Sequence, residues 1–231
     1  SVDPDEAFSS IPYEKGARFV VLLERAAGRE RFDRFLHAYL GRFRFTSITT
    51  EDFLAFLDAE LPGAAEEVGA RQWLYEVGMP PNAPVFRSDA LETLTALGEG
   101  WTTGRRPSAE QVARWSPSEL LVYLQHLPRQ VDHAACAWLD GQLALTGRGN
   151  HEILVEWLTI AAGSDYEPVF GRIREVLLRV GRMKYLRPLY TALGRNPRSR
   201  ALAREIYAAA APGYHILSRR VVESVMEKYD G

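Results

Sequence analysis

Two short segments of the chain carry side chains suited to work on a peptide bond or a carboxylate. Near the start, Tyr13 lies between Pro12 and Glu14. A phenol stays protonated near neutral pH, so it can donate a hydrogen bond to an oxygen that gains negative charge. Much further along, Arg182 and Lys184 lie two residues apart. An arginine fork fits a planar carboxylate, and a lysine adds a compact positive charge beside it.

Each candidate also has a structural interpretation that the residues alone leave open. Tyr13 is one of ten tyrosines and can simply pack a helix start. Arg182 and Lys184 can form a solvated basic cap at the end of the preceding helix, where cations suit the dipole. On a regular helix, side chains two residues apart point in different directions. Arg182 and Lys184 can therefore serve one site only where a loop enters a helix. Gly181 before the pair and Pro188 after it permit that irregularity.

The chain lacks the metal-binding pattern of a zinc peptidase. His-Glu-x-x-His places two histidines on one helix face to hold zinc, with the glutamate as general base. Of the five histidines, no two lie four residues apart, and the nearest imitation, at His151-Glu152, lacks the second histidine. We interpret it as chance. The single cysteine, Cys136, excludes a thiolate zinc cluster, and its apolar setting predicts a buried, inert thiol, so we expect no metal on this chain alone.

The sequence around both candidates resembles one enzyme family. The similar segments are Pro-Tyr-Glu-Lys-Gly at 12–16, Ser-Ile-Thr-Thr-Glu-Asp-Phe at 47–53 and Gly-Arg-Met-Lys-Tyr-Leu-Arg-Pro at 181–188. They resemble the M1 zinc aminopeptidases, in the branch of leukotriene A4 hydrolase and aminopeptidase B. The resemblance covers essentially the whole chain, although unevenly.

The resemblance implies a role for each candidate. Tyr13 would steady the oxyanion of the tetrahedral intermediate, and Arg182 with Lys184 would hold the carboxylate of the substrate. Asp5 matches an aspartate that lines the family's substrate channel, although an acid at a helix start explains it equally well. Phe8 replaces the tyrosine that contacts the lipid epoxide in leukotriene A4 hydrolases, which disfavours epoxide chemistry. Zn²⁺ would belong to the parent enzyme, on ligands outside this chain.

Helical periodicity dominates the sequence, and strand-like alternation is hard to find. In Phe19, Leu22, Leu23 and Ala26, apolar residues recur at intervals of three and four, which indicates an amphipathic helix packed on a core. Short helices with short breaks follow from Ser108 onward, which favours stacked antiparallel pairs. The later ones are predicted over 131–145, 150–162, 166–180, 184–193, 198–210 and 214–229. Thr49 or Thr50 is expected to cap a helix that begins near Glu51, and Ser116 with Glu119 to form a capping box. The fold class is therefore predicted to be all-α. We find no strict repeat, so the resemblance is what favours an α-solenoid of the HEAT or armadillo kind over a plain bundle.

The chain is expected to divide at a proline-rich stretch. Pro80, Pro81 and Pro84 fix backbone angles and remove hydrogen-bond donors, which predicts an extended segment. The predicted parts are the C-terminal helical part of a catalytic domain over 1–77, a proline-containing linker and connecting helix over 78–107, and an α-helical repeat domain over 108–231.

Composition limits the partners of the chain. Its 28 basic and 30 acidic residues give a net charge of −2, so no global field attracts nucleic acid or an anionic membrane. No apolar run approaches the ~18 residues of a membrane helix, and the polar opening does not resemble a signal peptide. We expect a peptide substrate and the N-terminal remainder of the same enzyme as partners, no nucleic acid and no membrane. A single cysteine suits a reducing compartment, which predicts a cytoplasmic location.

The sequence thus predicts the C-terminal portion of an M1-type zinc aminopeptidase that removes N-terminal residues from short peptides. Without the zinc motif, this chain alone is expected to be inactive. A non-catalytic helical-repeat module that binds proteins is the alternative from another class, and a lipid epoxide hydrolase is the third. One observation separates the first two: whether His-Glu-x-x-His and a zinc-binding glutamate lie directly upstream.

Overall fold

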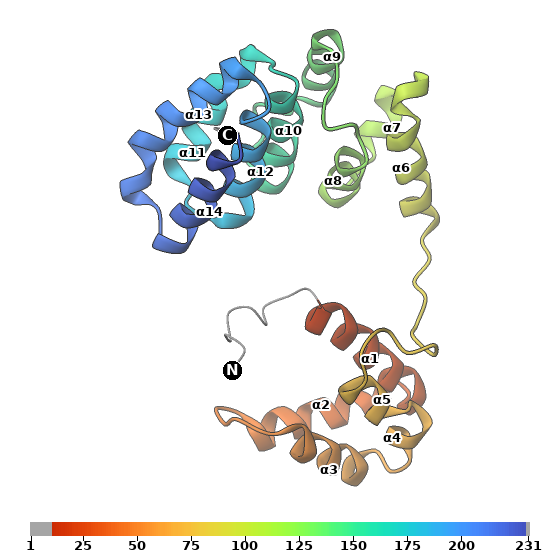
Figure 1. Cartoon of the computed structure of the whole chain (residues 1–231). Helices are drawn as coiled ribbons and strands as arrows, with labels where there is room; N and C mark the ends of the chain where they lie inside the picture. Colours follow the sequence, from red (N-terminus) through yellow and green to blue (C-terminus); the bar gives the residue numbers. More distant parts are fainter. Residues whose placement is uncertain (1–10, 230–231) are drawn as a thin grey trace. The chain divides into compact units, whose positions relative to one another are not determined.

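Every regular element in the computed structural model, which describes residues 11–229, is a helix. The all-α prediction is confirmed for this range. The chain divides into two compact units, residues 1–86 and 87–231 (Figure 1). None of the described helices is long and apolar enough to cross a membrane. The first unit contains α1 (Ile11–Ala27), α2 (Arg29–Phe43), α3 (Thr50–Glu60), α4 (Ala64–Glu67) and α5 (Ala70–Tyr75).

The second unit contains the remaining helices. Its α-helices are α6 (Asp89–Glu99), α7 (Ala109–Ala113), α8 (Pro117–Gln125), α9 (His133–Leu143), α10 (His151–Gly163), α11 (Phe170–Arg179), α12 (Met183–Leu193), α13 (Pro197–Ala210) and α14 (Ile216–Glu227). Short 3₁₀ turns η2 (Gly100–Thr103), η3 (Glu167–Val169) and η4 (Ala211–Gly213) join some of them.

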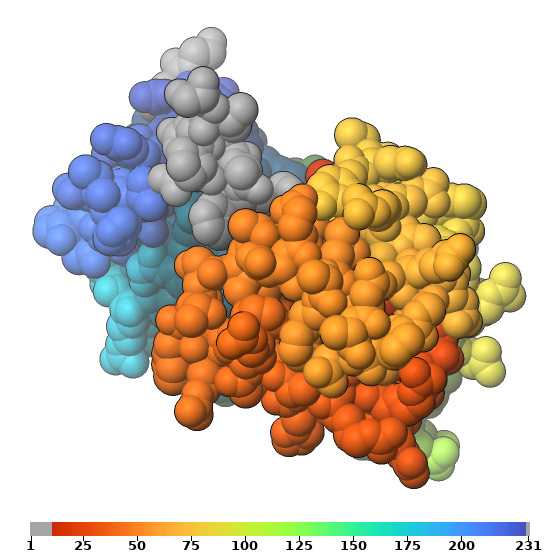
Figure 2. All heavy atoms as spheres, turned by 90° about the horizontal axis from the view of Figure 1, so that it is seen from below, coloured from red at the N-terminus to blue at the C-terminus, as the bar shows by residue number. Residues whose placement is uncertain are grey.

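Aromatic side chains fill the core of the first unit. From α2, the rings of Phe35 and Tyr39 lie 6.5 and 6.0 Å from that of Phe53 on α3. From α5, Trp73 lies 5.8 Å from Phe19 on α1. These contacts tie the helices to a single core. Figure 2 shows one face of this unit, where side chains in orange to yellow-orange close into a continuous surface.

Two helix starts follow the local sequence as predicted. Thr49 accepts a hydrogen bond from the Asp52 amide at 3.1 Å, and the Asp52 carboxylate accepts one from the Thr49 amide at 2.9 Å. Ser116 and Glu119 form the same reciprocal pair at the start of α8. Both are capping boxes, which short-range residue types encode without help from the tertiary fold.

The proline-rich stretch packs onto the first unit. Asn82 accepts a hydrogen bond from the Trp73 indole at 3.1 Å and donates one to the Val68 carbonyl at 2.9 Å. The Arg18 guanidinium donates to the Pro84 carbonyl at 2.7 Å. Prolines remove donors, but carbonyls and the asparagine amide still bind the helices. The boundary between the two units falls at residues 86/87, inside the segment predicted as linker and connecting helix, and α6 packs on α8 within the second unit.

The second unit is a two-layered stack of helices. In one layer α6, α8, α10, α12 and α14 pack successively on one another, and in the other α11 packs on α13 (Figure 1). Their buried apolar side chains form one continuous core. Successive helix pairs that contact only their neighbours define an α-solenoid, as predicted.

Helices α12 and α14 run in the same direction. Near their starts, the Ser218 hydroxyl on α14 donates to the carbonyl of Gly181, just before α12, at 3.0 Å. At the other end, the Tyr229 hydroxyl donates to the Thr191 carbonyl at 3.0 Å. Parallel neighbours bring their N-termini to the same edge of the layer, so groups that precede these helices lie close together.

The layer repeats with a period of about 33 residues. Helices α8, α10, α12 and α14 begin at residues 117, 151, 183 and 216, so successive starts lie 34, 32 and 33 residues apart. Contacts keep this offset: the amides of Gln130 and Asn196 both donate to the carbonyl of Gly163, each 33 residues away. A structural repeat is therefore present although the residues show no strict sequence repeat.

Cys136 on α9 lies in the core of the second unit. The thiol is buried, and burial raises its pKa to about 11. It therefore stays protonated at neutral pH, which agrees with the predicted inert thiol.

Candidate functional site

Arg182 and Lys184 lie where α12 begins. Arg182 directly precedes the helix with non-helical backbone angles (φ −75°, ψ 119°), and α12 starts at Met183. The Arg182 carbonyl accepts hydrogen bonds from the amides of Tyr185 and Leu186 at 2.9 and 3.1 Å, which closes the first turn. The pair thus occupies a loop that enters a helix, the arrangement that a joint site requires.

The two cations converge on the ring of Tyr185. The Arg182 guanidinium carbon lies 5.6 Å from the ring centre, and Lys184 Nζ lies 6.0 Å from it. The His151 ring stacks on the same tyrosine, with 6.3 Å between centroids. Tyr185 is buried, whereas Arg182 and Lys184 are exposed. A fixed aromatic ring therefore supports two solvent-facing cations.

Glu152 links this cluster to the neighbouring helix α10. Its carboxylate accepts a hydrogen bond from Lys184 Nζ at 2.6 Å and another from the Tyr185 hydroxyl at 2.7 Å. The bond from Lys184, followed by that from Tyr185, lowers the pKa of Glu152. The bond to Glu152, followed by desolvation, raises the pKa of Tyr185. Glu152 is therefore ionised and Tyr185 protonated at neutral pH.

The start of α12 also favours an anion. The amides of Met183 and Lys184 belong to the first helical turn, where N–H groups have no carbonyl partner within the helix. The helix dipole adds partial positive charge at this end. Two cations at this end of the helix are repelled by the partial positive charge of the dipole unless a negative charge lies beside them. Glu152 supplies one carboxylate, and the remaining positive charge suits an incoming one.

Tyr13 lies in the first turn of α1 and faces solvent. The residue is 70% exposed, and no hydrogen bond of its hydroxyl is present within residues 11–229. Beside it, Lys15 donates to the Glu76 carbonyl at 2.6 Å and anchors the helix start to the segment after α5. Tyr13 therefore does not pack the core of its unit, so its phenol is available to a ligand.

Two further sequence predictions concern residues that lie outside the described range. Asp5 and Phe8 belong to residues 1–10. The substrate-channel role of Asp5 and the argument from Phe8 against epoxide chemistry stay predictions.

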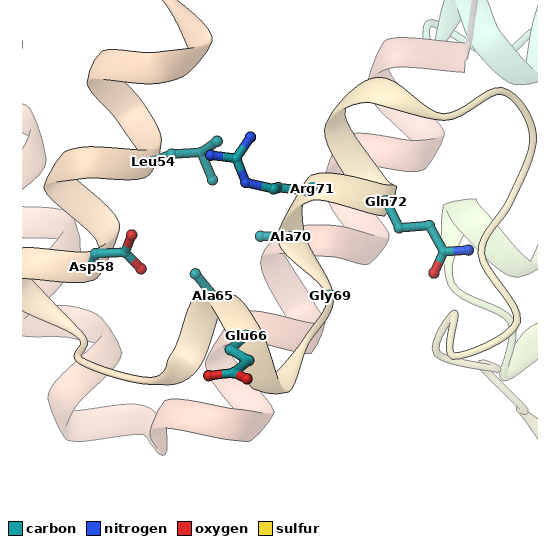
Figure 3. A pocket seen from close by; sticks show the side chains of 8 residues that line it. All are labelled: Leu54, Asp58, Ala65, Glu66, Gly69, Ala70, Arg71 and Gln72. Atoms are coloured by element: carbon teal, nitrogen blue, oxygen red, sulfur yellow. The ribbon is translucent and has the colours of Figure 1, made fainter.

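Two hollows of the surface lie away from Tyr13, Arg182 and Lys184. One of about 490 Å³ lies between α3, α4 and α5. Figure 3 shows Arg71 reaching toward Leu54 there, with Asp58 and Glu66 on another side of the space. None of the predicted site residues lines it. A second hollow, of about 320 Å³, is lined by Arg187 and residues of α14, so Arg187 faces away from the Tyr185 cluster.

No group of three or more His, Cys, Asp or Glu side chains is arranged to hold a metal ion within residues 11–229. The His151-Glu152 imitation of a zinc motif is engaged differently, since both side chains contact Tyr185. Neither side chain of this imitation belongs to a cluster of metal ligands within the described residues.

Sequence reasoning missed Glu152 and Tyr185 as partners of the basic pair. Glu152 was noticed only as part of an incomplete zinc motif. Its contact with Tyr185 spans 33 residues, which equals the period of the solenoid. Aligning the predicted helix starts at that period would have brought the two residues together.

Comparisons with known proteins identify the family of the chain. The C-terminal domain of leukotriene A4 hydrolase matches residues 115–226, and the peptidase family M1 domain matches residues 1–73. Leucine aminopeptidase 2 of Emericella nidulans is 31% identical over 96% of this chain and 37% of its own length. The Neurospora crassa protein of the same name is 31% identical over 96% of this chain and 35% of its own. Native yeast leukotriene A4 hydrolase superposes with a TM-score of 0.79 and 25% identity, covering 98% of this chain and 40% of that one.

The chain therefore belongs to the M1 aminopeptidase family and corresponds to the C-terminal portion of its longer members. It spans little more than a third of the length of these curated relatives. M1 aminopeptidases in general are zinc enzymes.

Proposed function

We propose that this chain is part of a zinc aminopeptidase that removes N-terminal residues from short peptides. Arg182 and Lys184 hold the free C-terminal carboxylate of the substrate, Tyr13 stabilises the oxyanion, and Asp5 lines the channel. The observation that carries the proposal is the convergence of two exposed cations at the start of α12, in a chain of this family.

The carboxylate role follows from the chemistry of the pair. The Arg182 guanidinium offers parallel N–H donors that match both oxygens of a carboxylate. Lys184 gives one donor to Glu152 and keeps two for a ligand. The carboxylate is charged before, during and after peptide cleavage, so these groups position the substrate and bind ground state and transition state alike.

Tyr13 acts at a different stage of the reaction. The carbonyl oxygen of the scissile bond gains negative charge only as a nucleophile attacks. A phenolic O–H aimed at that oxygen therefore stabilises the transition state more than the ground state. The exposure of Tyr13 at the start of α1 supports this role, because a core tyrosine has no access to substrate.

The first unit exposes many large apolar side chains. Its exposed large apolar residues include Ile11, Leu40, Phe45, Val77 and Val85. Exposed apolar side chains suit an interaction surface where they gather into a patch. We propose that the N-terminal remainder of the enzyme packs on it and carries the zinc ligands, which residues 11–229 do not provide. A cytoplasmic location stays a prediction from the single cysteine.

The test compares Arg182, which directly precedes α12, with Arg187 on that helix, in the full-length enzyme. Arg182→Ala is expected to raise KM for free-acid tripeptides about tenfold or more and to change KM little for the same peptides with a C-terminal amide. Arg187→Ala is the matched control, because Arg187 is exposed on the same helix but faces a different hollow. It should affect neither series.

Two outcomes would overturn the proposal. Equal effects of Arg182→Ala on free-acid and amide peptides would remove the carboxylate role. Absence of His-Glu-x-x-His and a zinc-binding glutamate from the upstream coding sequence would favour the non-catalytic helical-repeat module instead.

A further inference from the structure

We propose that Glu152 is a specificity-determining residue that matches the carboxylate site to a single negative charge. This inference rests on the proposed function, because it concerns which peptide ends Arg182 and Lys184 accept. Its basis is the Glu152 carboxylate, bound to Lys184 at 2.6 Å and to Tyr185 at 2.7 Å across two helices.

The net charge of the cluster follows from its charged side chains. Arg182 and Lys184 contribute two positive charges, and Glu152 removes one, which leaves a net charge of +1 on these three side chains. One carboxylate of a ligand neutralises that charge. A peptide that ends in aspartate or glutamate brings a second carboxylate, which then meets a neutral cluster with Glu152 facing it. Without Glu152 the cluster would carry +2 and suit a dianionic end.

Glu152 is the carboxylate of α10 that reaches this cluster. Glu156 lies one turn further along the same helix and is paired with Arg129 instead. The Glu152 side chain keeps 35% of its surface exposed and the Lys184 side chain 57%, so a ligand can approach both. Tyr185, buried beneath them, donates its hydroxyl to this carboxylate, and the ion pair with Lys184 holds the negative charge beside the two cations.

The readout is a ratio between two substrates in the full-length enzyme. Ala-Ala-Gln and Ala-Ala-Glu have nearly the same shape, share the terminal carboxylate and differ by one negative charge. Glu152→Gln is expected to shift the ratio of their kcat/KM values about two- to fivefold toward the glutamate peptide, the size of one unit-charge interaction near 4 Å in water. General damage to the site acts on both peptides and cancels in the ratio.

Three variants separate charge from shape. Glu152→Asp keeps the charge and should leave the ratio as in wild type. Tyr185→Phe removes the hydroxyl without changing the charge and should also leave it. Lys184→Gln removes a cation and should shift the ratio the opposite way, toward the glutamine peptide.

A matched control removes the same charge elsewhere. Glu175 is exposed on α11 and pairs with Arg172 at 2.7 Å, so Glu175→Gln should not move the ratio. An unchanged ratio in Glu152→Gln, with Arg182→Ala still selective for free acids, overturns this inference alone. Loss of that selectivity overturns the proposed function instead. If Glu152→Gln fails to fold, Lys184→Gln decides, since an unmoved ratio there contradicts the charge-matching role.

Discussion

The two units of the chain bury and expose apolar side chains very differently. Thirty-four buried side chains form the core described for the second unit, against twelve in the first. Yet eleven large apolar residues are exposed in the described part of the first unit and only five in the larger second unit. The second unit thus buries more of its large apolar side chains, while the first unit leaves more of them exposed to solvent.

This difference extends to the candidate groups. Arg182, Lys184 and Glu152 are positioned by helices of the self-contained solenoid. Tyr13 stands at the start of α1, on the unit that exposes more large apolar side chains. We therefore expect the second unit to bind an anion by itself. Oxyanion stabilisation by Tyr13 is expected to require the N-terminal remainder that we propose packs on the first unit.

The largest expected effect tests the stability of each unit. Leu57 and Leu158 are both fully buried, one in each core. Truncation to alanine costs about 2–5 kcal/mol at such positions. We expect Leu57→Ala to abolish amide protection throughout α1–α5, and Leu158→Ala to lower protection in α8–α14 while leaving that unit folded. Hydrogen exchange followed by mass spectrometry measures both in the 231-residue chain. Equal residual protection in the two variants would erase the contrast between the units.

The next effect tests the chemistry assigned to the first unit. In the full-length enzyme, Tyr13→Phe should lower kcat about a hundredfold and change KM little, because the phenol acts when charge develops on the carbonyl oxygen. Tyr39→Phe is the control, since Tyr39 packs against Phe35 and Phe53 in the core. A Tyr13→Phe enzyme with wild-type kcat contradicts the oxyanion role.

The smallest expected effect is a change in the pKa of one glutamate. It is tested by comparing two tyrosine–glutamate pairs, one in each unit. Tyr75 donates to Glu51 at 2.6 Å, as Tyr185 does to Glu152, and both bonds lower the pKa of the glutamate. Only Glu152 has a lysine partner as well. Lys184→Gln should therefore raise the pKa of Glu152 toward the ordinary value and leave that of Glu51 unchanged.

The sign of the linked stability follows from the direction of these shifts. A glutamate with a lowered folded-state pKa stabilises the fold above its unfolded pKa, about 4.3. That contribution is lost as pH falls through the lower folded value. Carbon-13 NMR of the side-chain carboxyls measures both titrations, and equal changes at Glu51 and Glu152 in Lys184→Gln would contradict the assignment of the shift to Lys184.

Much of the local structure could be predicted from short-range chemistry. Helices expected over 150–162, 184–193 and 198–210 are found at 151–163, 183–193 and 197–210. The cap at Ser116 could also be predicted from the sequence, since its partner Glu119 lies three residues away. Such features depend on neighbours in the sequence, and a single sequence contains them.

The departures have physical causes that local patterns do not show. A helix predicted over 131–145 begins after the Asp132 cap and ends before Ala144, which adopts a left-handed conformation (φ 48°) unusual for a residue with a Cβ. Pro168 falls in a 3₁₀ turn that precedes α11, so the helix predicted from 166 starts late.

The candidate site shows the same limit. Arg182 and Lys184 were found by their resemblance to a family, but the charge that accompanies them was not. Glu152 contacts them from another helix, at a separation that only the packing of the solenoid sets. Contacts of this kind require the tertiary arrangement or knowledge of its period.

The single buried cysteine makes the second unit suitable for labelling experiments with thiol reagents. Cys136 is the single thiol in 231 residues, and it is inaccessible and protonated in the folded second unit. A thiol reagent can reach it only when the surrounding helices open, so its reaction rate reports how often they do. A cysteine engineered at an exposed position would react far sooner, which allows a dye to be attached there without first removing the native residue.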